Sequence, residues 1–235
     1  MTDIANIAPP RVPRRRLAIA GDGSVTGDAA SDQLGATLRY ACRMASQIEP
    51  LLEIGPLQWL STLSGTAVTA RVGQNAGGVT LTAEIEERAA RTPLSVPSTD
   101  PDGAHAAIRK CLRRVRDGLD AEWGAVITWD KRLAGAFLPE AGSKRTGVRE
   151  VLSEVGLRAL AVVGSLDESY RETAVLLEYR QGSLLVVAVE GDVVFAFADR
   201  FDKSIAGPVI DGVRAALAPH DLDLVWTWGE SWTHE

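Results

Sequence analysis

The sequence predicts an α+β protein that contains two similar units, each with a small antiparallel sheet and amphipathic helices. Short apolar strands separated by glycine-containing turns occur in two blocks, residues 14–90 and 104–235. Each block also has apolar residues at helical spacing between its second and third strands. Landmarks of the first block recur at nearly constant offsets, so that the hairpin residues Asp22 and Asp130 are 108 positions apart. Such a repeat indicates a duplicated ββαβββ unit.

The composition is that of an ordinary globular protein, with 46% hydrophobic and 24% charged residues among 235. The net charge of -6 argues against a protein that binds nucleic acid over its whole surface. Cys42 and Cys111 have no second cysteine or histidine at metal-binding spacing, so we expect reduced packing residues. The start of the chain lacks the apolar run of a secretory signal, and no run of about eighteen apolar residues occurs. We therefore expect a cytoplasmic protein without an integral membrane segment.

Proline-rich stretches indicate where the units begin and end. Residues 1–13 contain three prolines, which predicts a flexible N-terminal segment. Residues 91–103 contain three more, together with small polar residues, which is the composition of a linker. These boundaries predict a first unit at 14–90, a second unit at 104–220 and a tryptophan-rich C-terminal tail at 221–235.

The first unit is expected to begin with a strand at 17–20, a turn at Asp22-Gly23 and a short return strand. A helix from Asp32, capped by Ser31, follows. Its apolar side carries Leu34, Leu38, Ala41, Ala45 and Ile48. Three strands are then expected at 58–63, 67–72 and 79–85. This unit lacks an opening helix, and its closing helix is at best short.

The second unit is expected to open with a helix at 104–119, followed by a hairpin whose turn lies at 130–132. The hairpin strands are expected at 123–129 and 133–138. The next helix, capped by Ser143, has one apolar stripe that carries Val148, Val151, Leu152, Val155, Ala159 and Val162. Strands at 173–179, 183–189 and 193–198 and a helix at 203–217 complete the order αββαβββα.

The glycine-rich stretch Gly21–Gly27 poses the question of a phosphate site. It lacks the lysine of a P-loop, and its third glycine falls one position late for a dinucleotide fingerprint. Asp22 would also repel a bound phosphate. Asp-Gly between apolar runs instead favours a two-residue hairpin turn in which both central residues take positive φ.

The order of strands and helices resembles that of the roadblock/LC7 domain. The segments "LAIAGDGSV" and "WGAVITWDKRLAGAF" are similar to the opening hairpin of that family, and "LLVVAVEGDVVFAFADRF" is similar to its closing strands. The resemblance covers nearly all of 104–218 and, more weakly, 14–90. It implies two roadblock-like (profilin-like) units, each a five-stranded antiparallel sheet with the middle helix on one face and terminal helices on the other. Such domains generally dimerise by pairing the middle helix and the neighbouring strand.

The resemblance implies a non-enzymatic scaffold or regulator that binds a small Ras-like GTPase, of the bacterial kind, or a related protein. It supplies no catalytic residue, cofactor or metal ligand. Two such units could pair within one chain as a pseudo-dimer or between chains as a homodimer. The alternative function is that of a small-molecule sensor of profilin-like or PAS-like type, because a small sheet flanked by helices can also enclose a ligand.

Three groups of residues are candidates for partner binding. The first is the basic face of the helix at 104–119, which is either a solvated surface or a site for an acidic partner. It consists of Arg109, Lys110, Arg113, Arg114 and Arg116. The second is the apolar pair Val151 and Val155 on the middle helix. The third is Trp226 and Trp228 in the tail, which either docks on its own domain or anchors a partner.

Overall fold

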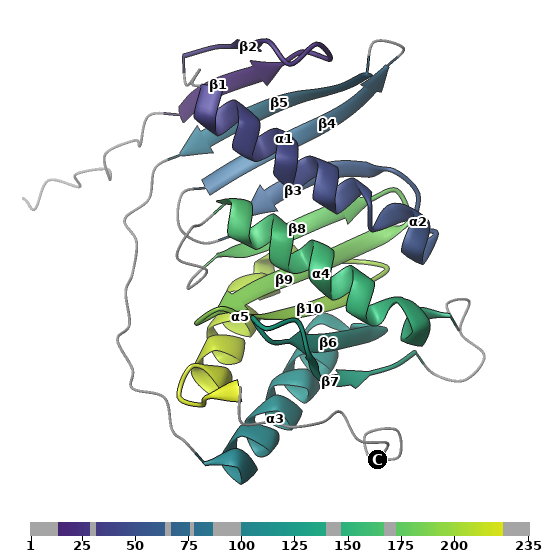
Figure 1. The fold of residues 1–235 in the computed structure, drawn as a ribbon, viewed down its shortest axis with the longest axis vertical. Coiled ribbons are helices and arrows are strands. Elements are labelled where there is room, and N and C mark those ends of the chain that lie inside the picture. The colour runs from purple at the N-terminus through teal and green to yellow at the C-terminus, as the bar shows by residue number, and fades with distance from the viewer. Residues whose placement is uncertain are drawn as a thin grey trace, which may run out of the picture.

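The computed structural model describes residues 14–28, 32–63, 67–75, 78–86, 100–139, 147–166 and 173–222. Within these ranges the chain forms one ten-stranded antiparallel sheet with helices packed on it (Figure 1). The expectation of an α+β protein is therefore confirmed. The N-terminal segment 1–13, most of the predicted linker, the caps Ser31 and Ser143, and the tail residues Trp226 and Trp228 lie outside the described residues.

The elements follow one another in the order ββααβββ, then αββαβββα. The strands are β1 Arg14–Ile19, β2 Val25–Thr26, β3 Leu57–Thr62, β4 Ala67–Asn75, β5 Gly78–Glu86, β6 Trp123–Ile127, β7 Leu133–Phe137, β8 Ala174–Tyr179, β9 Gly182–Val189 and β10 Asp192–Ala198. The helices are α1 Asp32–Ser46, α2 Glu49–Leu52, α3 Pro101–Leu119, α4 Val148–Leu166 and α5 Lys203–Leu217. Helix α5 has the bounds that its apolar spacing predicts.

The sheet has two halves with the same internal order. Its strands run β2-β1-β5-β4-β3-β8-β9-β10-β6-β7. We call β1 to β5 with α1 and α2 the first half, and α3 to α5 with β6 to β10 the second half. Read outward from the centre, each half presents its third, fourth, fifth, first and second strand. The halves meet where β3 pairs with β8, for instance at Leu60 opposite Leu177.

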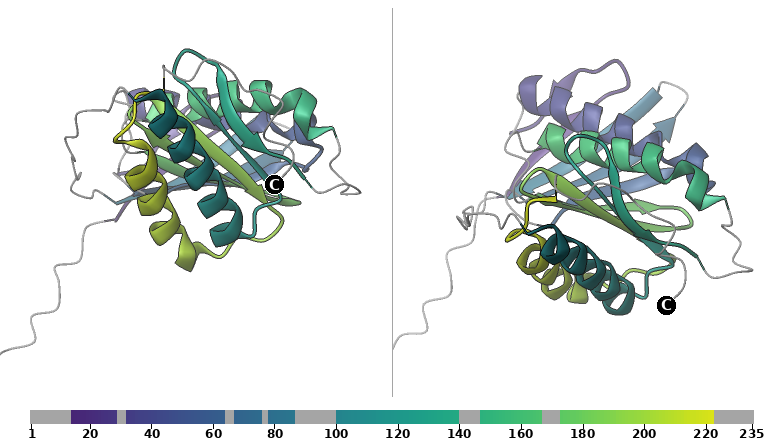
Figure 2. Two further views of the ribbon diagram at one scale, coloured as in Figure 1. Left: turned by 90° about the horizontal axis from the view of Figure 1, so that it is seen from below. Right: turned by 60° about the horizontal axis from the view of Figure 1, so that its bottom comes forward.

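In the second half both faces of the sheet are covered. Helix α4 lies on one face, while α3 and α5 lie together on the other (Figure 2). Every residue of β9 and β10 is buried as a result. This is why these strands are continuous apolar runs such as "SLLVVAV" and "VVFAFA" rather than alternating ones.

In the first half a helix covers only one face. Along β1, Leu17 and Ile19 are buried beneath α1, whereas the residues between and before them are exposed. Along β5, Leu81 and Ala83 are buried while Thr82 is exposed. Antiparallel strands with this alternation can leave one face in water. Within the described residues, the outer face of this half therefore carries no helix.

Helices α1 and α4 lie side by side on the same face of the sheet (Figure 1). Beneath them one apolar core runs through both halves, from Leu17 in β1 to Phe197 in β10. The hydroxyl of Tyr179 in β8 donates a 2.8 Å hydrogen bond to the carbonyl of Ala45 in α1. The two halves thus share a sheet, a core and a buried hydrogen bond within one chain.

Helix α3 begins earlier than the sequence predicted. It starts at Pro101, inside the predicted linker 91–103, rather than at Ala104. The Asp100 carboxylate accepts a hydrogen bond from the Asp102 N–H, and proline is well suited to the first turn because it has no N–H to leave unpaired. The Asp-Pro pair interpreted as linker composition is therefore a helix-start signal.

Candidate functional site

The two hairpins at the outer ends of the sheet have the same loop. In the first half, the Ala20 N–H donates to the Ser24 carbonyl at 3.0 Å, and the Gly23 N–H donates to the Ala20 carbonyl at 2.9 Å. In the second half, 108 positions later, Thr128 N–H donates to the Arg132 carbonyl at 2.9 Å, and Lys131 N–H to the Thr128 carbonyl at 2.8 Å. Both are three-residue hairpin loops.

The expected two-residue turn with two positive φ angles is therefore wrong. Only the third loop residue has positive φ, with values of 92° at Gly23 and 72° at Lys131. The Asp22 carboxylate accepts hydrogen bonds from the N–H and hydroxyl of Ser24, at 2.9 and 2.8 Å. These bonds lower the pKa of Asp22. An anionic carboxylate bound to the loop's own donors disfavours a phosphate there, as the sequence indicated.

The second-half hairpin holds a tryptophan at its tip. The Trp129 N–H donates to the carboxylate of Asp192, at the start of β10, at 3.0 Å. On the other side of the loop, the Thr128 hydroxyl and the Arg132 guanidinium both donate to Asp130. Burial alone would raise the pKa of Asp130, but these hydrogen bonds lower it below its usual value. The tip is therefore fixed from two sides, while the Trp129 side chain is 61% exposed.

Trp129 forms one wall of a groove on the face of the sheet that carries α1 and α4. We call it the helix-face groove, and its volume is about 840 Å³. It is lined by Tyr40, Met44, Trp129, Lys131, Leu157, Arg158, Leu160, Ala161, Gly164, Ser165 and Gly191. Helix α1 supplies Tyr40, which is 48% exposed. Helix α4 supplies the largest share of the lining, including the small residues Ala161 and Gly164.

The lining of the groove is apolar with positive charge. Its charged residues are Lys131 and Arg158, and among the residues that the structure describes no acidic one lines it. Arg158 forms an ion pair with Glu154 one turn earlier on α4, with 3.2 Å between nitrogen and oxygen. Lys131 is exposed at the hairpin tip. The groove is therefore a local positive surface on a chain whose net charge is -6.

The structure places the predicted partner-binding valines inside the protein. Val155 is fully buried in the core under α1 and α4, and Val151 is half-buried against the same core. The apolar stripe of α4 therefore packs within the chain, and Val155 offers no surface to a partner. The apolar spacing therefore identified the buried face of α4.

The basic residues of α3 lie away from the helix-face groove. Arg109, Lys110, Arg113, Arg114 and Arg116 are all exposed, on the helix layer that covers the opposite face of the sheet. Arg114 also lies across α5, where a Cβ at Gly212 would come within 2.0 Å of its Nε. The small residue at 212 thus allows this arginine to pack between the two helices.

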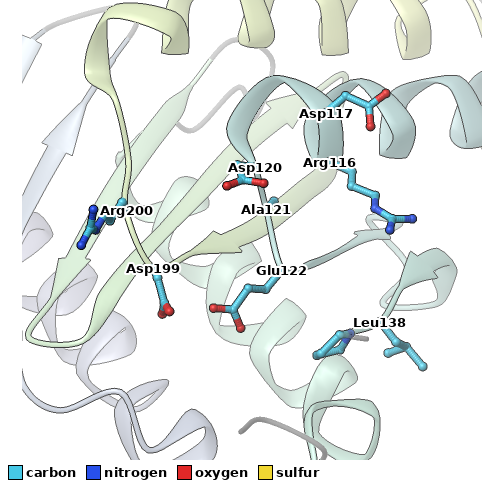
Figure 3. Close-up of a pocket in the computed structure, with 9 residues that line it drawn as sticks. Arg116, Asp117, Asp120, Ala121, Glu122, Leu138, Asp199 and Arg200 are labelled. Carbon is cyan, nitrogen blue, oxygen red and sulfur yellow. The ribbon is translucent and has the colours of Figure 1, made fainter. Parts of the chain in front are cut away.

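A second pocket, of about 560 Å³, lies at the end of α3 (Figure 3). Its charged lining residues are Arg116, Asp117, Asp120, Glu122, Asp199 and Arg200. The acidic side chains come from α3, from the segment after it and from the segment after β10. Two arginines offset their charge, and the described residues contain no group of histidine, cysteine or acidic side chains arranged to hold a metal ion.

The cysteines are packing residues, as their isolation in the sequence predicted. Both are buried and free. Burial raises the pKa of the Cys42 thiol to about 12 and that of Cys111 also to about 12. Because the thiolate is the reactive form, neither is poised as a nucleophile near neutral pH.

Sequence reasoning missed the helix-face groove. The candidates did not include Tyr40, Met44 and Trp129. The first two lie on α1, whereas Trp129 lies at a hairpin tip far along the chain, so no local pattern connects them. The available signal was Trp129 itself. Trp129 directly precedes the loop residue Asp130, but the predicted strand 123–129 included it as a strand residue.

Comparison with known proteins gives one distant likeness. No family model matches the chain, and no curated protein matches it. Among solved structures, Myxococcus xanthus MglB aligns over 58% of this chain and 100% of its own, at 14% sequence identity and a TM-score of 0.38. Among the described residues, none of the helices combines the length and the apolar character needed to cross a bilayer.

Proposed function

We propose that this protein is a non-enzymatic scaffold or regulator of the roadblock/LC7 type, which binds a small Ras-like GTPase or a related protein partner. The observation that carries the proposal is the pairing of the two halves. Helices α1 and α4 pack side by side, and β3 pairs with β8, so that the middle helix and its neighbouring strand are the contact on each side. This is the mode of pairing that the resemblance in sequence implies for roadblock-like domains.

In this proposal the chain is a tandem arrangement, with roadblock-like units at 14–90 and 104–220 that form an intramolecular pseudo-dimer. The equal strand order of the halves and the identical hairpin loops 108 positions apart support it. Among the described residues of the first unit no terminal helix covers the sheet, and the outer face of its strands is polar. There Arg16 forms an ion pair with Glu84 at 3.5 Å, and the Arg71 guanidinium lies 5.6 Å from the Trp59 ring centroid.

The absence of catalysis is part of the same proposal. In the described part of the chain, the groove is lined by apolar and cationic side chains, with one serine and no carboxylate, histidine or cysteine. The Ser165 hydroxyl donates to the Val162 carbonyl of its own helix at 2.8 Å, so its proton is used within the helix. Such a lining suits contact with another protein better than acid-base or nucleophilic chemistry.

Binding to purified GTPases tests the proposal. A panel of small bacterial Ras-like GTPases, each loaded with GDP or with a non-hydrolysable GTP analogue, is measured against the full chain by biolayer interferometry. We expect saturable binding to at least one member that depends on the bound nucleotide. Absence of binding across the panel contradicts the proposal. A rise in melting temperature with a small-molecule library would instead favour the sensor alternative.

The basic face of α3 provides a second arm of this test. We expect a variant with glutamine at Arg109, Lys110, Arg113 and Arg116 to bind the same GTPase more slowly if that face steers an acidic partner. Its melting temperature should hardly change, since exposed arginines contribute little to stability. Unchanged association rates at low and high salt would identify the face as a solvated surface.

A further inference from the structure

Trp129 is presented to solvent by a hairpin that is built to hold it. A large apolar ring that is 61% exposed loses the favourable burial that its size could provide. Its backbone N–H is nevertheless hydrogen-bonded to Asp192, 63 positions away. The next loop residue, Asp130, is also hydrogen-bonded, and Lys131 after it has a positive φ. A rigid exposed tryptophan is the residue type that anchors protein interfaces.

The corresponding loop of the first half shows that the fold does not need this side chain. Trp129 occupies the loop position that Gly21 occupies in the first hairpin, and Lys131 that of Gly23. The backbone hydrogen bonds of the two loops are the same. The tryptophan and lysine are therefore additions to a loop that forms without them.

The lining of the helix-face groove offers apolar surface to an inserted side chain. Tyr40 on α1 and Trp129 on the hairpin are exposed aromatic rings on different walls. Between them, α4 contributes the small residues Ala161 and Gly164 to the lining. An apolar side chain placed on these small residues would remove apolar surface of the lining from water.

The charge of the groove favours particular residues beside the inserted side chain in the partner. Lys131 and Arg158 contribute cationic groups, and the described part of the lining contains no acidic residue. Glu154 partly offsets Arg158, which makes Lys131 the stronger determinant. Carboxylates beside the inserted side chain would therefore be favoured, and lysine or arginine there would be repelled.

We propose that the helix-face groove binds a segment of a partner protein that presents an apolar side chain flanked by carboxylates, with Trp129 as the anchor and Lys131 as the selector of charge. This deepens the proposed function, since it specifies what a protein partner must present. A second copy of this chain and a free small molecule are the other occupants, and the experiment distinguishes them.

The experiment measures fluorescence anisotropy with two labelled synthetic peptides. Both are twelve residues long and carry a central Phe; four Asp and Glu residues flank it in one, and four Lys residues in the other. We expect the acidic peptide to bind the full chain at least about tenfold more tightly than the basic one. Trp129→Ala should weaken that binding about tenfold or more, because truncation of a central tryptophan removes an anchor.

Trp59→Ala is the matched control. Trp59 is 38% exposed on the opposite face of the sheet, against Arg71, so its truncation should change peptide binding less than about twofold. Lys131→Glu should weaken the acidic peptide and strengthen the basic one. Circular dichroism should show that all three variants keep the wild-type spectrum, since each changed side chain is exposed.

Equal binding of the two peptides, no binding of either, or an undiminished affinity in Trp129→Ala would overturn the inference. Dimerisation that Trp129→Ala abolishes would assign the groove to a second copy instead. If a small molecule displaces both peptides and the flanking charges do not change peptide affinity, the groove is assigned to a small-molecule ligand. If the acidic peptide binds as expected but no GTPase of the panel binds, the inference about the groove holds and only the proposed function is contradicted.

Discussion

In the second half of the sheet every residue of β9 and β10 is buried, whereas in the first half buried and exposed residues alternate along β1 and β5. Both halves nevertheless have the same strand order and the same outer hairpin loop. The difference follows from what covers the second face. Helices α3 and α5 require apolar side chains there, while Thr82, Glu84 and their neighbours remain in contact with water.

The comparison extends to the hairpin tips and to function. In the first half the tip carries Gly21, Asp22 and Gly23, which form a turn and present little side chain. In the second half the same positions carry Trp129, Asp130 and Lys131, and the tip becomes part of a groove. The same arrangement of strands thus occurs in both halves, and the halves differ at the outer face of the sheet and at the hairpin loop.

The largest effect should come from placing a charge in the apolar core. We expect Val155→Lys to reduce the free energy of unfolding by about 3–5 kcal/mol, because its ammonium group would lie in the apolar core without a partner. Urea unfolding measures this change. Ser153→Lys, on the exposed side of the same helix, is the control and should change stability by less than about 0.5 kcal/mol. Similar stabilities would show that α4 does not pack as described.

A smaller effect should follow from removing the hydrogen bond that links the halves. Burial raises the pKa of Tyr179 well above its usual value, so its hydroxyl stays protonated and donates to the Ala45 carbonyl. We expect Tyr179→Phe to cost about 1 kcal/mol, since it removes one buried hydrogen bond while the Ala45 carbonyl still accepts from the Ile48 N–H. Chemical unfolding measures the loss, and the exposed Tyr40→Phe should be nearly neutral. A neutral Tyr179→Phe would mean that water replaces the hydroxyl.

Stability should change in opposite directions when the third loop residue is changed from glycine to alanine in the first hairpin and from lysine to glycine in the second. Gly23→Ala should destabilise by about 1–2 kcal/mol, because alanine must then hold a φ of 92°. Lys131→Gly should stabilise by about 0.5 kcal/mol, since relief at φ 72° exceeds the added chain entropy of glycine. Thermal unfolding of both variants checks the signs. Equal signs would contradict the equivalence of the loops.

The smallest effect concerns pH. The pKa of Asp130 is lowered in the folded state, so the carboxylate stabilises the fold above its unfolded pKa, and this contribution is lost as pH falls through the folded pKa. We expect the melting temperature of Asp130→Asn to lie slightly below that of wild type at pH 6, and the difference to shrink as pH falls below 3.8 and through the folded pKa. A constant difference across this range would show that the hydrogen bonds do not depend on ionisation.

Much of the fold could be predicted because local pattern and tertiary environment agree. The apolar spacing located α5, and continuous apolar runs located β9 and β10 to within one residue. The start of α3 was missed, because Asp100 and Pro101 have the composition of a linker and also the chemistry of a helix cap. The hairpin loops were misassigned because Asp-Gly is compatible with loops of two or three residues.

The candidate site could not be predicted, because it is assembled from distant parts of the chain. Tyr40, Trp129 and Ala161 meet only when α1, the second hairpin and α4 are packed together. Val155 shows the opposite case. Its place on an apolar stripe was visible in the sequence, but periodicity marks a buried face without indicating whether the cover is the same chain or a partner.

The most direct test of the pairing between the halves is the mass of residues 100–235 expressed alone, measured by light scattering beside the full chain. Without the first half, the fragment exposes the β8 edge and the side of α4 that packs beside α1, and each copy offers these surfaces to the other. We predict a dimer of the fragment and a full chain with the monomer mass of 25.1 kDa. A folded fragment that stays monomeric at all concentrations would contradict it.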